Sequence, residues 1–443
     1  MPRSAVRLDF GGRLALVRLP GLVMSVISVQ RVPVFLVLLV GATLGLLPTP
    51  AGARDSTHEL DPEVVARAVE EYLARREATV TPATNRWERV LESLEISGDL
   101  RFRHESSVKL DQSRDRHREL VRVRLGATYE LQPWLSVGAR LTTGARTDPN
   151  SANVTLGNGF DSFEVSLDRA FAKLTPTPVP GAWLMAGKFA HPFVANPVYP
   201  SVLWDTDVSP EGVAAGYEWK GEGFLRAAGL TGGQYLLLEQ SGASDTSLSV
   251  AQLSTSFALC DRLGARTAVG YYHYGSTQPD GSRALVSDNQ GNATLDRDGD
   301  GTPDAYASRF GVVNSVAVVT SEVASVPIVL SGEWIANVRT GDRKQGWVCG
   351  AALGSAKDPG DWQVYYQWQV VEEDALFAAV ANNDFVLGTN YRGHVFGAKA
   401  CVAQDVVCHV YAFATHREHR GTSLSTNSES AQWRLRFDLE FRF

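Results

Sequence analysis

The chain has 443 residues, of which 44% are hydrophobic and 21% are charged, so it contains ample apolar material for a folded core. Its 49 acidic and 42 basic side chains give a formal net charge of −7, which argues against nucleic acid as a partner. With only four cysteines, the protein is neither a disulfide-rich scaffold nor a zinc finger.

Residues 1–53 have the features of a secretory signal peptide. An apolar run over 32–47 follows Arg31 and precedes small residues at Ala51 and Ala53. The run is shorter than the ~20 residues that a membrane-spanning helix needs. We therefore expect this segment to be cleaved and the remaining chain to be exported through the inner membrane, with Met24 as an alternative start.

Residues 54–94 predict a short periplasmic leader with one amphipathic helix. Asp61 is placed to cap the helix, and Pro62 occupies its first position. A single apolar stripe, which includes Val65 and Val69, is too little to hold a short helix folded alone. The helix is expected either to pack against another element or partner, or to fray.

From residue 95 onward, short segments alternate between apolar and polar side chains, which is the period of a β-strand. Over 433–443, every odd position is apolar and every even position is charged. Seven tight turns alternate with eight long polar loops, so fifteen connections join sixteen strands. We find no apolar element that could cover the charged faces as a soluble core.

This pattern predicts an all-β fold over residues 95–443, a transmembrane antiparallel β-barrel of 16 strands. In such a barrel the apolar faces contact lipid and the charged faces line the lumen. The last strand has 11 residues, close to the ~9–11 that a tilted strand needs to cross a bilayer. Closure of the barrel also satisfies every backbone group, as lipid demands.

Several motifs, in this order, resemble the putative porin family of Gram-negative bacterial outer membranes. They include ISGDLRFRHE (96–105), LDRAFAKL (167–174), MAGKFAHPF (185–193) and LWDTDVSPEG (203–212). The resemblance covers most of residues 95–443, and an acidic insertion, four cysteines and a shorter leader depart from it. It implies an outer-membrane pore for small hydrophilic solutes, in contact with lipid and lipopolysaccharide. Porins commonly form homotrimers.

The end of the chain also fits this family. A final strand that closes on a lipid-facing aromatic, here Phe443, is similar to the insertion signal read by the barrel-assembly machinery. Phe443 is therefore expected to direct insertion into the outer membrane.

Strand alternation places a set of arginines toward the lumen. The first three strands and the last become neighbours on closure, so most of these arginines share one wall. A basic wall would attract anions, whereas pairing with nearby carboxylates would merely keep the lumen wet. Both interpretations stay open. The predicted pore-lining residues are Arg101, Arg103, Arg122, Arg124, Arg140, Arg226, Arg434 and Arg436.

The third long loop, 191–212, is the candidate constriction. In sixteen-stranded general porins the third loop folds inward and narrows the channel. By that resemblance, Asp205, Asp207 and Glu211 would face the arginine wall and set a transverse field. An ordinary outward loop is the alternative.

The stretch LDRDGDGTPD (295–304) is a candidate Ca²⁺ loop. Asp296, Asp298 and Asp300 alternate, and Asp304 stands at the ninth position of an EF-hand pattern. The twelfth position is Ala307 rather than glutamate. No cofactor is required, and an acidic, glycine-rich surface loop needs no metal.

A disulfide between Cys401 and Cys408 is also predicted. A two-residue turn at 404–405 would place these cysteines directly opposite each other in an antiparallel pair. Export permits their oxidation.

The sequence therefore predicts an outer-membrane porin with passive diffusion through its lumen and, if the basic wall prevails, a slight anion preference. The rival hypothesis is a plugged surface barrel that binds a partner or adheres through Ca²⁺ and the loop at 276–307. An outer-membrane barrel enzyme is the minor alternative, because the sequence has no H-E-x-x-H or G-x-S-x-G motif.

Overall fold

The computed structural model describes residues 90–109, 114–241, 244–277, 290–297, 299–301, 303, 305–419 and 431–443. The expected signal peptide and almost all of the expected leader, including its helix, lie outside the described residues. In the part of the chain that is described, no helix is long and apolar enough to cross a membrane.

Sixteen antiparallel strands form one closed barrel, as predicted, and their consecutive pairing is continuous around the sheet. Three short strands lie outside this ring of sixteen: β4 (Val154–Thr155) adds to β2, and β11 (Thr294–Leu295) pairs with β12 (Ala305–Tyr306). The barrel strands are β1 (Leu94–Lys109), β2 (Arg116–Gln132), β3 (Leu135–Thr143), β5 (Val165–Leu174), β6 (Ala182–Lys188), β7 (Glu211–Lys220), β8 (Leu225–Leu238), β9 (Thr246–Cys260), β10 (Leu263–Gly275), β13 (Gly311–Val323), β14 (Val326–Asn337), β15 (Gln345–Gly354), β16 (Trp362–Val371), β17 (Tyr391–Ala403), β18 (Val406–Arg417) and β19 (Ala431–Arg442).

The first and last strands close the barrel. β1 pairs with β2 on one side and with β19 on the other, in a register that runs from Asp99 opposite Arg442 to Lys109 opposite Gln432. Beyond β19, Phe443 donates its backbone N–H to Gly98 at 3.2 Å and accepts the N–H of Gly98 at 2.8 Å. Because no strand edge is left open at this seam, the backbone groups there are satisfied without water.

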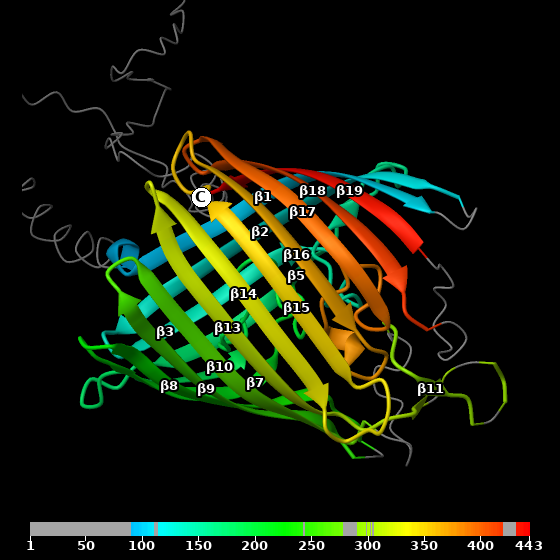
Figure 1. Cartoon of the computed structure of the whole chain (residues 1–443), viewed down its shortest axis with the longest axis horizontal. Coiled ribbons are helices and arrows are strands. Elements are labelled where there is room, and N and C mark those ends of the chain that lie inside the picture. The colour runs from blue at the N-terminus through cyan, green and yellow to red at the C-terminus, as the bar shows by residue number, and fades with distance from the viewer. Residues whose placement is uncertain are drawn as a thin grey trace, which may run out of the picture. The chain divides into compact units, whose positions relative to one another are not determined.

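The connections alternate between short and long, as the sequence predicts. The tight turns gather at one end of the barrel and the long loops at the other (Figure 1). At the turn between β13 and β14, Ala324 and Ser325 have φ values of 48° and 63°, the left-handed pair that a two-residue hairpin requires.

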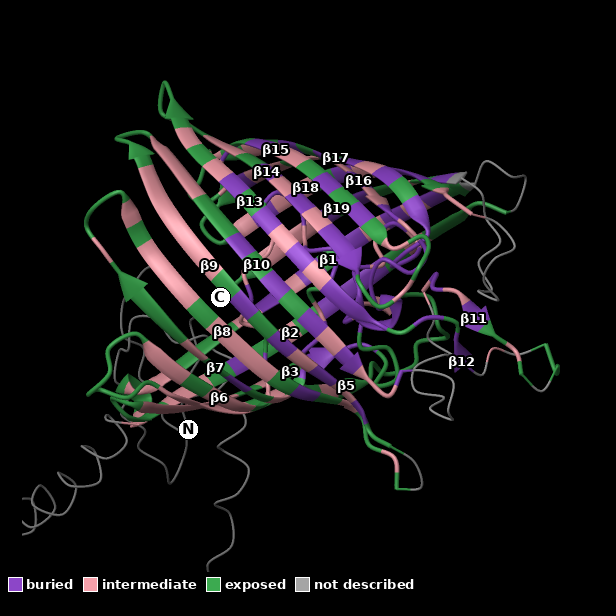
Figure 2. Cartoon of the chain, turned by 60° about the horizontal axis from the view of Figure 1, so that its bottom comes forward, coloured by how far each residue is buried: buried purple, intermediate pink, exposed green. Residues whose placement is uncertain are grey.

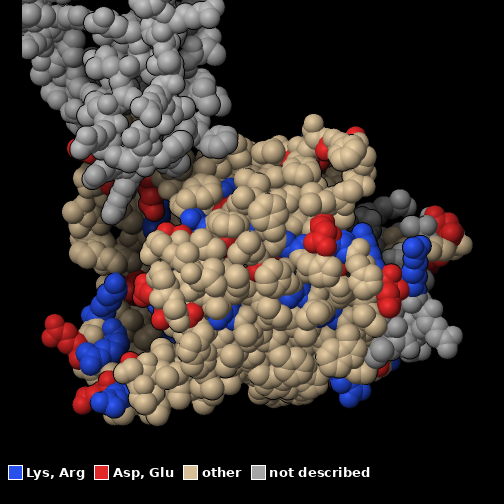
Figure 3. Space-filling model, turned by 90° about the horizontal axis from the view of Figure 1, so that it is seen from above, with Lys and Arg blue, Asp and Glu red and all other residues tan. Residues whose placement is uncertain are grey.

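The outer face of the barrel is apolar. In β19, Trp433, Leu435 and Phe437 are between 46% and 49% exposed, whereas Arg436 and Asp438 on the other face are buried. Buried and exposed residues alternate along the strands in Figure 2, and most of the face seen in Figure 3 is neither acidic nor basic. The predicted assignment of the two faces of this strand is confirmed.

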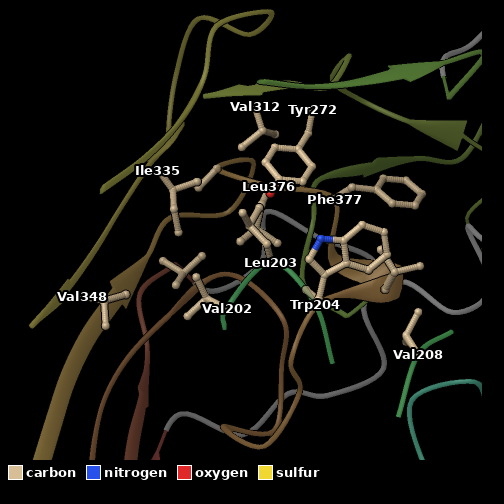
Figure 4. Packing of buried hydrophobic residues seen from close by; sticks show 14 of the residues in the cluster. Val202, Leu203, Trp204, Val208, Tyr272, Val312, Ile335, Val348, Leu376 and Phe377 are labelled. Atoms are coloured by element: carbon tan, nitrogen blue, oxygen red, sulfur yellow. The ribbon is translucent and has the colours of Figure 1, made fainter. Parts of the chain in front are cut away.

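One expectation about the lumen was wrong, because the barrel interior contains an apolar core. The loop at 189–210 and the loop at 372–390, with its short 3₁₀ turn η2 (Ala378–Val380), lie inside the ring of strands. Leu203, Trp204 and Phe377 from these loops belong to one buried apolar cluster with Tyr272 and Val348 of the inner wall (Figure 4). The two loops therefore supply the covering element that the strands alone lack.

Candidate functional site

A cavity of about 710 Å³ lies inside the barrel, between the wall and the two inward loops. Its wall comes from inward-facing residues of β1, β2 and β16–β19, and its other side comes from residues within 148–155, 196–200, 205–207 and 383–386. Five of the predicted pore-lining arginines border it, namely Arg101, Arg103, Arg122, Arg434 and Arg436. The inward fold of the third long loop places acidic side chains opposite these arginines.

Arg103 and Asp438 form a buried, two-pronged ion pair across the β1–β19 seam. The Nε and Nη2 atoms of Arg103 donate to the two carboxylate oxygens of Asp438 at 2.7 and 2.8 Å. The Tyr411 hydroxyl accepts from Arg103 at 2.6 Å and donates to Asp438 at 3.0 Å. The two-pronged geometry and the Tyr411 hydroxyl hold both charges in place.

Arg436 ties the wall to the loop at 372–390. Its Nε donates to Glu105 at 2.7 Å, and its Nη1 donates to Asp384 in that loop. Glu105 also accepts from Arg118 at 2.6 Å, and Arg434 donates to the backbone carbonyl of Asp384 at 2.9 Å. The loop is therefore held against β19 by a charge-assisted hydrogen bond and a backbone contact.

A third group of charges ties the wall to the loop at 189–210. Asp99 accepts from Arg122 at 2.9 Å and from Arg124 at 2.6 Å. Asp207 in the loop lies 3.7 Å from Arg122 and 3.4 Å from Arg124. Most of the arginine wall is thus paired with carboxylates, so the structure favours charge pairing over an unpaired basic wall.

The two inward loops also bind each other. The Asp205 N–H donates to the carbonyl of Val380 at 3.1 Å, and the Asn382 N–H donates to the carbonyl of Val202 at 3.3 Å. Tyr199 donates its hydroxyl to Asp384 at 2.8 Å. The loops therefore act as one packed unit inside the barrel.

The loop acids differ in charge. Burial, and then the charges of Asp384 and Asp207, raise the pKa of Asp205 well above its usual range, which favours the neutral form of this carboxyl. Burial alone would raise the pKa of Asp384, but Arg436 and Arg103 together hold it below its usual range. Asp384 therefore carries the negative charge of this pair.

Four residues that were expected in the lumen do not border the cavity: Arg124, which pairs with Asp99 and Asp207, and three others. Glu211 pairs with Lys188 at 2.8 Å, and strand alternation puts both on the outer face with the exposed Val213, so Glu211 does not face the arginine wall. Arg140 pairs with Asp168 on β5. Arg226 is exposed at a bulge that starts β8, where it donates to the carbonyl of Glu222.

The candidate Ca²⁺ loop is only partly described. Asp298 and Asp304 lie outside the described residues. The carboxylate of Asp296 accepts the N–H groups of Gly299 at 2.7 Å and Gly301 at 2.8 Å, so this side chain stabilises the turn. The described residues, taken alone, hold no cluster of three side chains suited to a metal ion.

The predicted disulfide is wrong. A bulge at Val402 shifts the β17–β18 register, so Cys401 lies opposite Val407 and Cys408 lies opposite Ala400. A shift by one residue moves a side chain to the other face. Cys401 is therefore buried toward the lumen, Cys408 faces outward, and both are free thiols.

Sequence reasoning missed several residues of the site. Alternation places Glu105 and Tyr411 on inward faces, so the strand pattern could have found them. Asp384 had no such signal, because it belongs to a loop whose path depends on the packing of residues 375–381 against the wall.

Comparison with known proteins gives one family. A family model described as a putative porin matches residues 106–309 and 315–443. No curated protein matches the sequence. Among solved structures, OprB from Pseudomonas putida is 12% identical with a TM-score of 0.50, and the match covers 81% of this chain and 96% of OprB. That likeness shows a shared fold.

Two further structures match over a similar length. OmpF from Salmonella typhi, in complex with daunomycin, is 12% identical with a TM-score of 0.49, covering 79% of this chain and 97% of OmpF. The anion-selective porin from Comamonas acidovorans is 11% identical with a TM-score of 0.47, covering 79% of this chain and 99% of that protein.

Proposed function

The chain belongs to the putative porin family, and on this premise we propose that its outer-membrane channel passes small hydrophilic solutes by diffusion along the cavity between the arginine wall and the inward loops. The observation that carries this proposal is the contrast between the two faces of one closed barrel. The outer face is apolar, whereas the charged side chains of the inner face border an internal cavity of about 710 Å³.

The charge of the cavity supports a slight preference for anions. Eight basic and seven acidic side chains line it, and the raised pKa of Asp205 favours the neutral form of one of the acids. Most of these charges are paired, so the surplus is small, and a small surplus of positive charge biases ion flux only modestly. The basic residues are Arg101, Arg103, Arg118, Arg122, Lys399, Arg434, Arg436 and Arg442.

Liposome swelling tests the diffusion pathway. Vesicles that contain the protein should swell in small sugars and amino acids at rates that fall steeply with solute size, because two loops occupy part of the lumen. Swelling no faster than in protein-free vesicles would overturn the proposal.

One observation favours a second candidate, a plugged barrel that binds or adheres at the cell surface. The loops at 189–210 and 372–390 bury a continuous apolar cluster inside the barrel, and such packing is how a lumen is blocked. In that case the protein would insert normally but carry no solute. Ca²⁺ bound near Asp296 and Asp300 would belong to this candidate, and calorimetric titration of the protein with CaCl₂ tests it.

Membership of the family also supports transport rather than catalysis. We further propose cleavage of residues 1–53, contact of the outer wall with lipid and lipopolysaccharide, and insertion by the barrel-assembly machinery through Phe443. A homotrimer is proposed on the same basis. N-terminal sequencing tests the cleavage, and native mass spectrometry tests the homotrimer. Pull-down of the barrel-assembly machinery, with a Phe443→Ala chain as control, tests the role of Phe443.

A further inference from the structure

Two cations in the cavity differ from the paired arginines around them. The first is Arg101, which is 9% exposed. Its Nη2 donates to Asn153 at 2.7 Å, but its nearest carboxylate contact among the described residues is to Asp438 at 4.0 Å. Its Nε is buried without a hydrogen-bond partner in that same part of the chain. An unpaired buried donor is destabilising, so the guanidinium group of Arg101 is less fully satisfied than those of the paired arginines around it.

The second cation is Lys399 on β17. Strand pairing sets Lys399 opposite His409, on an inward face that lines the cavity. Its ammonium group lies 5.5 Å from the centre of the Tyr365 ring and forms no ion pair with any described carboxylate. A cation held over an aromatic face keeps most of its charge available to a second ligand.

Aromatic side chains lie beside Lys399 on the cavity wall. His409 stacks on Tyr411 with ring centres 3.9 Å apart and planes inclined by 10°. The Tyr365 hydroxyl is 2.8 Å from His409 Nε2, which fixes the imidazole ring. Strand register places His409 between Lys399 on one side and Asp438 on the other. The wall therefore offers a flat, polarisable surface with a cation, Lys399, on one side and the paired Asp438 on the other.

The size of the cavity suits a small solute. About 710 Å³ falls within the range of ~300–1,000 Å³ that is usual for small-molecule sites. The neighbouring carboxylates limit the charge that such a solute can carry. Asp438 and Glu440 lie on the same wall, so a second negative charge would be repelled, and a monoanion fits better than a dianion.

We propose, resting on the diffusion pore proposed above, that this cavity binds the carboxylate of a small organic acid through Arg101 and Lys399, with the carbon skeleton against the His409–Tyr411 stack. The planar guanidinium group matches a carboxylate in shape and charge. The channel would thereby concentrate organic monoanions at its narrow part and pass them in preference to neutral solutes of the same size.

The test is a competition experiment on protein purified from outer membranes and inserted in planar bilayers. Sodium benzoate should reduce the chloride current with a saturable dependence on concentration. The Lys399→Gln and Arg101→Gln variants should each raise the half-blocking concentration about tenfold, as expected for loss of one charged hydrogen bond. Arg226→Gln removes the same charge at an exposed site outside the cavity and should leave the block unchanged.

The outcomes separate this inference from the pore itself. A chloride current that benzoate does not reduce, or a block that neither variant weakens, would overturn the site alone. Stronger block by inorganic phosphate than by benzoate would overturn its assignment to carboxylates. Absence of any chloride current would overturn the proposed pore together with this site. Because Arg101 is buried, the folding of each variant is checked by its heat-dependent gel mobility, and Lys399→Gln suffices if Arg101→Gln does not fold.

Discussion

Trp204 holds the inward loops in place, and its replacement by alanine should open the lumen. The indole is 2% exposed and stacks on His191 with ring centres 5.5 Å apart at an angle of 18°. It also meets Tyr235 of the inner wall edge-on at 6.5 Å. Truncating a buried tryptophan costs about 3–5 kcal/mol, because transfer free energy is lost and a void is left.

The two backbone hydrogen bonds between the loops cannot compensate for this loss. Each contributes about 1 kcal/mol net. We therefore expect Trp204→Ala to loosen the loop at 189–210 while the strand pairing of the barrel stays intact. The single-channel conductance should rise and become noisier, and the midpoint of urea unfolding, followed by gel mobility, should fall.

Trp347 provides the matched control. It is 49% exposed on the outer face of β15, so Trp347→Ala removes the same side chain without touching the loops. Conductance should then match the unsubstituted protein. If Trp204→Ala changes neither conductance nor unfolding midpoint beyond the Trp347→Ala control, the inward loops do not restrict the lumen.

Three other predictions follow from particular contacts. Asp438→Leu should lower the free energy of unfolding by about 3–5 kcal/mol, because it leaves Arg103 buried without its partner. Adding Arg103→Met to this variant should recover most of that loss in urea titrations. If the losses from the two substitutions simply add, the two residues are not coupled. Burial raises the pKa of Asp374 in the inward loop to about 6, so its contribution to stability is complete below pH ~4 and is lost as pH rises through about 6. Asp374→Asn should therefore make the thermal midpoint less dependent on pH between pH 4 and 7. An unchanged pH dependence of the midpoint would refute the assignment. Cys401 and Cys408 lie on opposite faces, so non-reducing gels should show the same mobility with and without dithiothreitol, and a shift would contradict the observed register.

The strands of this protein could be predicted from sequence because alternation is a local signal. The polarity of each residue from Trp433 to Phe443 indicates which face of the strand it lies on, and all eleven positions follow one alternating pattern. Turn chemistry then fixed the connections and hence the strand count. The same logic placed Arg101, Arg103, Arg122 and Arg436 on the cavity wall.

The errors arose where local signals do not determine the path of the chain. Counting residues outward from the turn does not predict the bulge at Val402, which directs Cys401 and Cys408 to opposite faces. Glu211 was counted with the loop although it is the first residue of β7, where strand alternation directs it outward. The inward course of residues 372–390 depends on long-range packing, so neither Asp384 nor its pairing with Arg436 could be anticipated.

The most direct test of the whole account is the single-channel conductance of the purified protein in a planar bilayer with a salt gradient across it. We expect stable, discrete current steps, smaller than a fully open sixteen-stranded barrel would give, with a zero-current potential of the sign that marks a slight anion preference. Protein that inserts as a folded barrel but carries no current would contradict the diffusion pore and favour the plugged binding barrel. A clear cation preference would show instead that Asp207 and Asp384 govern the field in the cavity.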